Sequence, residues 1–213
     1  MEYMVYKLKK ILVTGFEPFN GRDINPSEQI VKALLPPDDT ELIRLVLPVD
    51  YKKAELLLLN AAERERPDII LSLGQSGRLP AIEVEMLAAN IDSSLSGDGK
   101  QLLPDSSGFA PVDVPIDVAG KTAYFSSLPV RCIVSAINAA DIPAVCSFSA
   151  GTYVCNHVMY ASCGYAELHE NVASGFIHLP LLPGQINEDS KCCSMQFSEM
   201  LRGVQTALDI ISK

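Results

Sequence analysis

The sequence from Lys10 to Leu34 is KILVTGFEPFNGRDINPSEQIVKAL, and it contains the unit from which the rest of the chain is built. It begins with an apolar run ended by a Thr-Gly pair, which predicts a buried strand over Lys10 to Val13. It ends with a helical pattern over Pro26 to Leu34, where Asn25 is a suitable N-cap and proline occupies the first helical position. A strand followed by a helix is the repeating unit of an α/β protein.

The same alternation continues towards the C-terminus. Further strands are predicted over Glu41 to Leu47, Ile69 to Leu73, Ala144 to Phe148 and Val172 to Leu179, and further helices over Tyr51 to Glu65, Pro129 to Ala139, Gly151 to Tyr165 and Met195 to Ile211. Strands that alternate with helices favour a mostly parallel, twisted sheet covered on both faces. The predicted fold class is therefore α/β, with three layers in the order α/β/α.

The middle of the chain breaks this alternation. Ala81 to Asp92 has an extended pattern, and Ser93 to Pro115 is rich in Ser, Gly, Asp and Pro. These features predict a hairpin-like excursion and loop at one end of the sheet. The excursion is too short to be a domain of its own, so residues 1–213 are expected to form one domain.

The charge of the chain argues against polyanionic partners. The 213 residues carry a net charge of −9, with a pI of about 4.8. Binding to nucleic acid or to a membrane surface would need a strong basic cluster, and the only dense one, Lys7, Lys9 and Lys10, leads straight into an apolar strand. Neither partner is expected. The sequence shows no pattern of a membrane span or a secretory signal, so a cytoplasmic protein is expected.

The cysteines are expected to be free thiols. There are six, at positions 132, 146, 155, 163, 192 and 193. Without an export signal, disulfides are not the default, and most of these side chains should pack as small apolar groups. No C-x-x-C or H-x₃-H spacing is present, and the adjacent Cys192 and Cys193 point in different directions, so no metal site is predicted.

One cysteine follows a strand and opens a helix. In the run SFSAGTYVCN, residues 147–156, small flexible residues join the two elements and place Cys155 in or near the first turns of the helix. The unpaired N–H groups and the positive end of the helix dipole favour a thiolate there, and the same N–H groups suit an oxyanion. A packed helix cysteine is the alternative that position alone leaves open.

A nucleophilic cysteine needs a base, and the chain has three histidines. His157 follows Cys155 by two residues, so on a helix it points to nearly the opposite side and is expected at the surface or between elements. His169 lies in a polar stretch and is expected to be solvated. His178 closes an apolar strand at the edge where active sites of parallel sheets form. By elimination His178 is the best candidate, although a structural role is also open.

An imidazole base is usually oriented by a carboxylate. Glu83 and Glu85 lie within an apolar segment and share one face of a predicted strand, and the pattern alone does not choose between them. In the first loop, Phe16 and Phe19 come to a strand end. These two rings either cover the core or form a flat apolar slot for a ring-shaped ligand.

Four segments of the chain match one known family. They are Thr14-Gly-Phe-Glu-Pro-Phe19, Gly74-Gln75, Ala150-Gly-Thr-Tyr-Val-Cys-Asn156 with Tyr160, and Gly175-Phe-Ile-His-Leu-Pro180. In these segments the chain resembles pyroglutamyl-peptidase I, also called pyrrolidone-carboxylate peptidase, from about residue 10 to the C-terminus. The resemblance implies a cysteine peptidase that removes an N-terminal pyroglutamyl residue from peptides. It also implies an α/β/α fold, commonly a homotetramer, and no metal or cofactor.

The resemblance also implies roles for individual residues. The nucleophile falls on Cys155 and the base on His178. The acidic member falls on Glu85 rather than Glu83, because the family's run from Gly-Gln to its glutamate aligns here without a gap. The residues implied to bind the substrate are Phe16 and Phe19, which sandwich the pyrrolidone ring, and Gln75, Tyr153 and Val154 beside the same pocket.

The chain departs from the family pattern at several positions. Leu95 stands near an arginine that borders the family's active site, and Met86 stands where arginine is common. The family's Gly-Gly-Arg after Gly-Gln is Gly77-Arg78 here, and its late Pro-Glu-Gln is Pro183-Gly184-Gln185. The missing arginine motivates one alternative, a catalytically weakened or non-catalytic protein that binds pyroglutamyl groups. A nucleoside-phosphorylase-like enzyme is a second alternative, but no Gly-rich or Arg-rich phosphate loop is visible.

Overall fold

The centre of the molecule is a six-stranded sheet. The computed structural model describes residues 8–96, 99–186 and 193–213. The strands, in sheet order, are β2 (Thr40–Leu47), β1 (Lys9–Phe16), β3 (Ile69–Gln75), β8 (Ala173–Leu179), β4 (Ile82–Glu85) and β7 (Ala144–Ser147). All neighbouring pairs are parallel except β4 and β8, which are antiparallel. The predicted mostly parallel sheet is confirmed.

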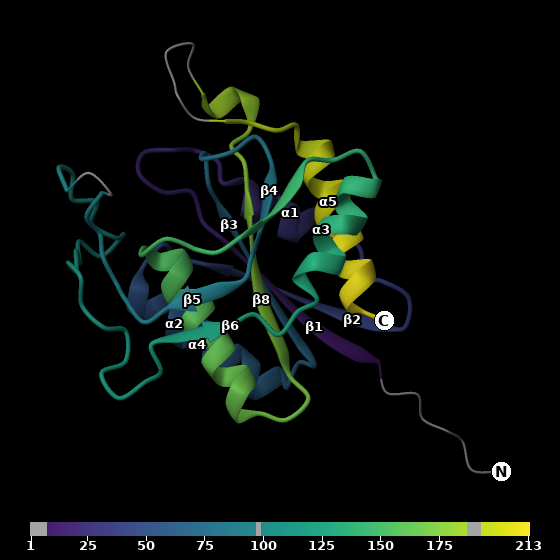
Figure 1. Ribbon diagram of the computed structural model, residues 1–213, viewed down its shortest axis with the longest axis horizontal. Coiled ribbons are helices and arrows are strands. Elements are labelled where there is room, and N and C mark those ends of the chain that lie inside the picture. The colour runs from purple at the N-terminus through teal and green to yellow at the C-terminus, as the bar shows by residue number, and fades with distance from the viewer. Residues whose placement is uncertain (1–7, 97–98, 187–192) are drawn as a thin grey trace.

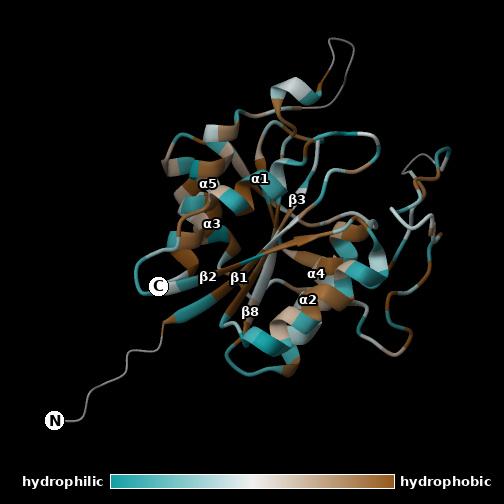
Figure 2. Ribbon diagram, turned by 180° about the vertical axis from the view of Figure 1, so that it is seen from behind, coloured by the Kyte–Doolittle hydropathy of each residue, from teal (hydrophilic) through white to brown (hydrophobic). Residues whose placement is uncertain are grey.

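Five α-helices of the described residues cover the two faces of this sheet. They are α1 (Pro26–Ala33), α2 (Tyr51–Glu65), α3 (Val130–Ala139), α4 (Val154–Leu168) and α5 (Phe197–Ile211). Figures 1 and 2 show α1, α3 and α5 on one face and α2 and α4 on the other. The predicted α/β/α order of layers is therefore confirmed.

The hydrophobic core is divided by the sheet into two clusters. Because successive strand residues point to opposite faces, Ile11 and Val13 pack with α1, α3 and α5, whereas Leu12 packs with α2 and α4. All three side chains are fully buried. This explains why the strand is a continuous apolar run instead of an alternating pattern.

The start of the first two helices is stabilised as their sequences indicate. The Asn25 side chain accepts a hydrogen bond from Ser27 N, and the Asp50 side chain accepts one from Lys53 N. Helix α4 begins at Val154, three residues later than predicted, because the preceding chain is a turn in which Gly151 has a φ of 82°. A positive φ is incompatible with a helical turn, so the predicted start at Gly151 is wrong.

The middle of the chain contains both a strand of the main sheet and a separate excursion. The extended segment predicted over Ala81 to Asp92 splits at Met86: β4 joins the main sheet, and β5 (Leu87–Ala89) pairs with β6 (Ala123–Phe125) as a small antiparallel sheet. Placing the whole segment outside the main sheet was wrong for β4. Its Ile82 and Val84 are buried in the core with α3 and α5 on one face, and Glu83 and Glu85 are buried on the other.

Strand direction sets the geometry of the site. Because β4 is antiparallel to β8 and parallel to β7, the carboxyl end of β7 does not lie at the same sheet edge as that of β8. The carboxyl ends of β1, β3 and β8 do lie together. The chain after β7 must instead travel back along the sheet to bring α4 to that edge.

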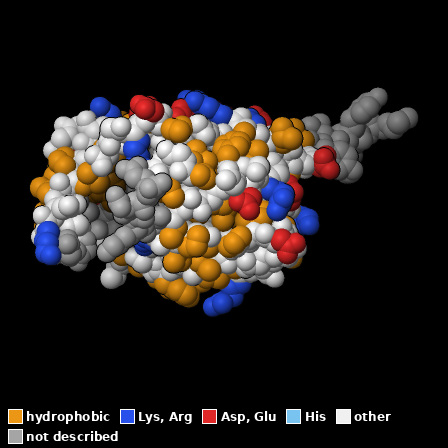
Figure 3. Space-filling view, turned by 90° about the horizontal axis from the view of Figure 1, so that it is seen from above, with side chains coloured by type: hydrophobic (Ala, Val, Ile, Leu, Met, Phe, Trp, Pro, Cys, Tyr) orange, Lys and Arg blue, Asp and Glu red, His pale blue; other side chains and the backbone are white. Residues whose placement is uncertain are grey.

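The surface agrees with the charge of the chain. On the face drawn in Figure 3, lysine and arginine side chains are scattered around the molecule and do not form one patch. Within the three described ranges, no helix is both long and apolar enough to cross a membrane.

Candidate active site

The carboxyl end of β8 places a histidine beside a carboxylate from β4. In the antiparallel ladder Glu83 lies opposite His178, so Glu85, two residues further on, lies diagonally from it on the same face. His178 Nδ1 is 2.7 Å from Glu85 Oε1. Glu85 is fully buried and His178 is 4% exposed, so water competes little for this hydrogen bond.

The Cys155 thiol approaches the same histidine from helix α4. Cys155 is the second residue of α4, whose N-cap makes no side-chain hydrogen bond, so backbone N–H groups of the first turn remain unpaired. The Cys155 thiol lies near enough to the imidazole to act on its pKa. Since Nδ1 is held by Glu85, Nε2 is the nitrogen left to interact with the sulfur.

A glycine in β3 makes room for the sulfur. A Cβ atom added at Gly74 would lie 2.9 Å from Cys155 Sγ and 2.7 Å from the Phe176 ring. Both distances are too short for real contacts, so only glycine allows the thiol to lie over the strand next to β8.

These contacts set the charge of the histidine. Burial alone lowers the pKa of His178, but hydrogen bonds with Cys155 and Glu85 and the charges of both raise it to about 9. At neutral pH the imidazole is therefore protonated. A cation held beside a cysteine at a helix N-terminus stabilises the thiolate, which is the nucleophilic form of the side chain.

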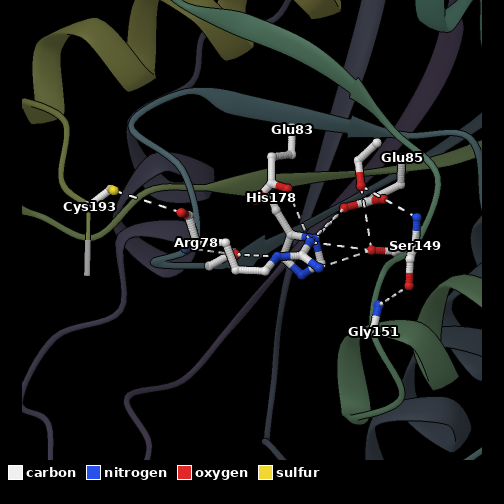
Figure 4. A network of polar contacts seen from close by, with 9 residues as sticks. Arg78, Glu83, Glu85, Ser149, Gly151, His178 and Cys193 are labelled. Carbon is white, nitrogen blue, oxygen red and sulfur yellow. Dashed lines mark hydrogen bonds and ion pairs between the residues drawn. The ribbon is translucent and has the colours of Figure 1, made fainter. Parts of the chain in front are cut away.

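An arginine that sequence reasoning gave no role lies beside this group (Figure 4). Arg78 Nη2 is 3.1 Å from Glu83 Oε1 and 3.6 Å from Glu85 Oε1, and both terminal nitrogens lie 3.3 Å from Ser149 O. A signal for it existed in the sequence. Two acidic residues on one face of an apolar strand need a nearby cation, and Arg78 is the nearest arginine that precedes them.

A cavity of about 250 Å³ opens next to Cys155. Its lining includes Cys155 and all five residues predicted to bind the substrate, Phe16, Phe19, Gln75, Tyr153 and Val154, together with Asn20, Arg22, Ile24, Asn25, Val49 and Leu103. Phe16 is 2% exposed and packs in the core, as one interpretation of this ring predicted, and it also lines the cavity. The Phe19 and Tyr153 rings are 5.9 Å apart.

The side-chain amide of Gln75, which lines this cavity, has an orientation set by the neighbouring Gln185. Gln185 accepts a hydrogen bond from Leu182 N through Oε1 and donates to Ile24 O through Nε2, so backbone groups fix the sense of its amide. Gln185 Nε2 also donates to Gln75 Oε1 at 3.0 Å. The Gln75 Nε2 group, which has no partner among residues 8–96, 99–186 and 193–213, therefore remains a donor for a ligand.

Comparison with known proteins gives a consistent result. The family model described as pyroglutamyl peptidase matches residues 9–213. Pyrrolidone-carboxylate peptidase 1 of Caldanaerobacter subterraneus subsp. tengcongensis is 39% identical over 206 residues, which cover 96% of this chain and 98% of that protein. Pyrrolidone-carboxylate peptidase of Fusobacterium nucleatum subsp. nucleatum is 41% identical and covers 96% and 93% of the two chains.

Solved structures agree. Pyroglutamyl peptidase I of Bacillus amyloliquefaciens has a TM-score of 0.88 and 32% identity, with 96% of this chain and 95% of that chain aligned. A mutant pyrrolidone carboxyl peptidase of Pyrococcus furiosus has a TM-score of 0.86 and 37% identity, with 95% and 97% aligned. The chain belongs to the pyroglutamyl peptidase family.

This member of the pyroglutamyl peptidase family departs from the family pattern at positions that the structure now places. Leu95 pairs with Leu102 in the excursion and lines a second cavity that shares Asn20, Leu103 and Tyr153 with the first. Met86 packs against the core cluster of α3 and α5. Arg78 is an arginine that contacts Glu83 and Glu85 in this family member.

The other two histidines do not reach the site. His157 is buried, with Nδ1 at 2.8 Å from Asp92 Oδ2 and Nε2 at 3.3 Å from Glu55 Oε2. His157 was predicted to lie either at the surface or between elements. It lies between elements, where the two carboxylates are its partners, so the surface prediction is wrong. His169 is partly exposed and stacks on Tyr165, with Nδ1 at 2.8 Å from Tyr165 O.

The other described cysteines lie outside the cavity. The described ones, Cys132, Cys146, Cys155, Cys163 and Cys193, are all free thiols, and Cys192 lies outside the described residues. The Cys193 thiol donates to Arg78 O at 3.7 Å. Among residues 8–96, 99–186 and 193–213, no three His, Cys, Asp or Glu side chains cluster as metal ligands would.

Proposed function

We propose that this protein hydrolyses the peptide bond after an N-terminal pyroglutamyl residue, with Cys155 as nucleophile, His178 as base and acid, and Glu85 as the group that orients His178. The observation that carries this proposal is the line of contacts from Glu85 through His178 to Cys155, which ends at a half-apolar cavity. Membership of the pyroglutamyl peptidase family supports the same reaction.

The cavity suits the pyroglutamyl ring. Phe16 and Phe19 offer flat apolar surfaces to the ring, and Tyr153 and Val154 close the wall next to Cys155. The Gln75 amide donates to the lactam carbonyl oxygen. A free N-terminus would have to bring a charged ammonium group into this pocket without a carboxylate partner among the lining residues, which costs several kcal/mol. The neutral lactam avoids that cost.

The reaction proceeds in two steps. The Cys155 thiolate attacks the pyroglutamyl carbonyl carbon, and unpaired N–H groups of the first turn of α4 stabilise the oxyanion. The His178 imidazolium then donates its Nε2 proton to the leaving amine as the C–N bond breaks, which leaves a thioester. In the second step neutral His178 accepts a proton from water, the resulting hydroxide attacks the thioester, and pyroglutamate leaves as the thiolate–imidazolium pair is restored.

A purely binding role has less support. It was motivated by Leu95 in place of the family's arginine, but the three groups needed for attack and proton transfer are in contact in this chain. The phosphorylase-like alternative gives way to the family assignment, because the family model covers nearly the whole chain.

Release of a chromogenic amine from a pyroglutamyl amide tests the proposed reaction. Fresh, reduced wild type is expected to release the amine, and Cys155→Ser is expected to reduce kcat by about 1,000-fold or more, because a serine hydroxyl is far less ionised than a thiol. Cys132→Ser, on the exposed surface of α3, is the matched control and should retain full activity. No release by wild type contradicts the reaction, and undiminished release by Cys155→Ser contradicts the nucleophile.

We also infer that residues 1–213 act as one peptidase domain that assembles into a homotetramer in the cytoplasm. A reducing compartment suits a catalytic thiol and the free cysteines. Exposed apolar side chains on the excursion, at Phe109, Val112, Val118 and Phe125, offer surface for contacts between copies. Sedimentation equilibrium of the reduced protein measures the assembly, and a monomer at micromolar concentration contradicts the tetramer.

A further inference from the structure

Strand β4 carries two buried carboxylates to the same histidine. Glu83 is 4% exposed and Glu85 is fully buried, and both lie on the face of the sheet that holds His178. Of the two, Glu85 is the one hydrogen-bonded to the imidazole, at 2.7 Å. Two buried anions side by side repel each other and cannot be hydrated, so a chain that keeps both must supply a cation.

Arg78 supplies that cation from the connection between β3 and β4. Its Nη2 group makes its shorter contact with Glu83 Oε1, at 3.1 Å, and its longer one with Glu85 Oε1, at 3.6 Å. Glu85 Oε1 is also the atom bonded to His178. The arginine therefore pairs mainly with Glu83 and leaves Glu85 to the histidine.

The same guanidinium also reaches the chain that leads to the nucleophile. Both terminal nitrogens donate to Ser149 O, in the connection between β7 and α4, and Nε donates to Ser76 Oγ at 3.1 Å. Figure 4 shows the arginine between the two glutamates and this connection. Arg78 thus joins the strand that bears the acid to the segment that places Cys155.

We propose that Arg78 is a positioning residue of this active site: it cancels the charge of Glu83 beside His178 and holds the segment before Cys155 in place. The inference rests on the proposed peptidase function and deepens it. Arg78 does not line the substrate cavity, so it acts through His178 and Cys155 and not on the pyroglutamyl ring.

The direction of the electrostatic effect follows from the groups that face His178. Cys155 from α4 and Glu85 from β4 act on His178 directly. Glu83 lies opposite His178 in the ladder, and Arg78 contacts both glutamates. Without Arg78, the Glu83 anion acts unopposed and makes the imidazolium a weaker acid. Without Glu83, Arg78 acts unopposed and makes it a stronger acid. The Arg78 side chain is 48% exposed, so solvent weakens both effects.

Three variants test this inference by the pH dependence of kcat/KM. In Arg78→Met, the alkaline limb of the kcat/KM profile should move to higher pH by about 0.5 to 1 pH unit. Its kcat should fall about ten-fold, and its KM should stay within two-fold of wild type. Glu83→Gln should move the alkaline limb down by a similar amount. The double variant should return the limb to its wild-type position, because the paired charges are removed together. Arg202→Met, an exposed arginine on α5, is the control for loss of one positive charge and should change nothing.

A second measurement separates this inference from the peptidase proposal. Mass spectrometry of the Cys155 peptide follows its alkylation by iodoacetamide against pH and needs no substrate turnover. The alkaline step of this rate should shift in the same directions in the three variants. An inactive wild type whose alkylation profile shifts as described contradicts the peptidase and supports Arg78. Two outcomes overturn the role of Arg78. One is an alkylation profile of Arg78→Met that matches wild type at every pH. The other is a double variant that shows the sum of both kcat losses while the alkaline limb of its kcat/KM profile does not return to the wild-type position.

Discussion

At the scale of single residues, contacts in the folded protein distinguish two glutamates that the sequence pattern does not. The sequence pattern places Glu83 and Glu85 on one strand face and offers no reason to prefer either. In the structure Glu85 is 2.7 Å from the imidazole, while Glu83 pairs with Arg78 at 3.1 Å. The diagonal offset of the antiparallel ladder brings the farther glutamate to the histidine, and a ladder register is not visible in one strand's sequence.

Glu85→Gln tests the acidic member at this scale. Glutamine is neutral, so the imidazolium loses its charged partner and its pKa falls from about 9 towards the ordinary value of about 6.5. The alkaline limb of kcat/KM should therefore move to lower pH, and kcat at pH 7.5 should fall about 100-fold. Glu170→Gln, on the exposed surface beyond α4, is the control. An alkaline limb that stays in place contradicts the assignment of Glu85.

At the scale of elements, the short helix after β8 reaches the substrate cavity through one side chain. The 3₁₀ turn Pro183–Gln185 holds Gln185 by the Leu182 N–H group, and Gln185 in turn fixes Gln75. The sequence marked this turn only as a departure from a family motif. Its effect on the cavity depends on two connections, after β1 and after β8, that are more than 150 residues apart.

Gln185→Glu and Gln185→Ala test this arrangement. A glutamate at position 185 still accepts a hydrogen bond from Leu182 N but cannot donate one to Gln75 Oε1. The Gln75 amide is therefore expected to rotate, so that its Nε2 donates to the new glutamate. Its oxygen would then face the lactam carbonyl oxygen, which cannot donate a hydrogen bond to it. KM should rise about ten-fold for Gln185→Ala and more for Gln185→Glu, with kcat changed less, since one hydrogen bond is worth about 1.4 kcal/mol.

A surface glutamine provides the matched control for these variants. Gln205 on α5, far from the cavity, accepts a hydrogen bond from Leu35 N and donates one to Leu35 O. Its amide is therefore held by two backbone groups, as that of Gln185 is. Gln205→Glu should leave KM unchanged. A KM for Gln185→Glu at or below that of Gln185→Ala would contradict the proposed orientation of Gln75.

At the scale of the whole molecule, a second buried histidine ties the excursion to the fold. His157 in α4 contacts Asp92 in the excursion and Glu55 in α2. Burial lowers its pKa, but hydrogen bonds to Asp92 and Glu55 raise it to about 9. The folded state therefore holds this proton more tightly than the unfolded chain, whose histidines titrate near 6.5. The resulting stability is fully present below about pH 6.5 and is lost as pH rises through about 9.

His157→Gln tests this linkage through the free energy of unfolding in urea. Wild type should lose at most about 3 kcal/mol of stability from this group between pH 6 and pH 9.5. The variant should be less stable at pH 6 and lose less than wild type over the same range, while His178 still contributes its own share. His169→Gln, at a partly exposed site, is the control. An equal loss of stability by His157→Gln and wild type over this pH range contradicts the linkage.

Local signals were sufficient for most of the longer elements of the fold. Apolar runs between turn residues located β1, β2, β3 and β8, and the caps Asn25 and Asp50 act where helices were expected. The assignment of β4 to the excursion was wrong because a four-residue strand carries little periodic signal. Its place in the sheet depends on pairing with β7 and β8, which are distant in sequence.

By itself, the sequence determined the α/β/α class, the candidate nucleophile Cys155 and, through matching motifs, the family. These depend on patterns within short segments, such as apolar period, caps and residue order. Only the tertiary structure decided that β4 runs against β8, that Arg78 stands between Glu83 and Glu85, and that Gln185 orients Gln75. The first and third of these join segments far apart in the sequence, and the second depends on how the β3–β4 connection folds against the sheet, so the packing of the elements sets all three.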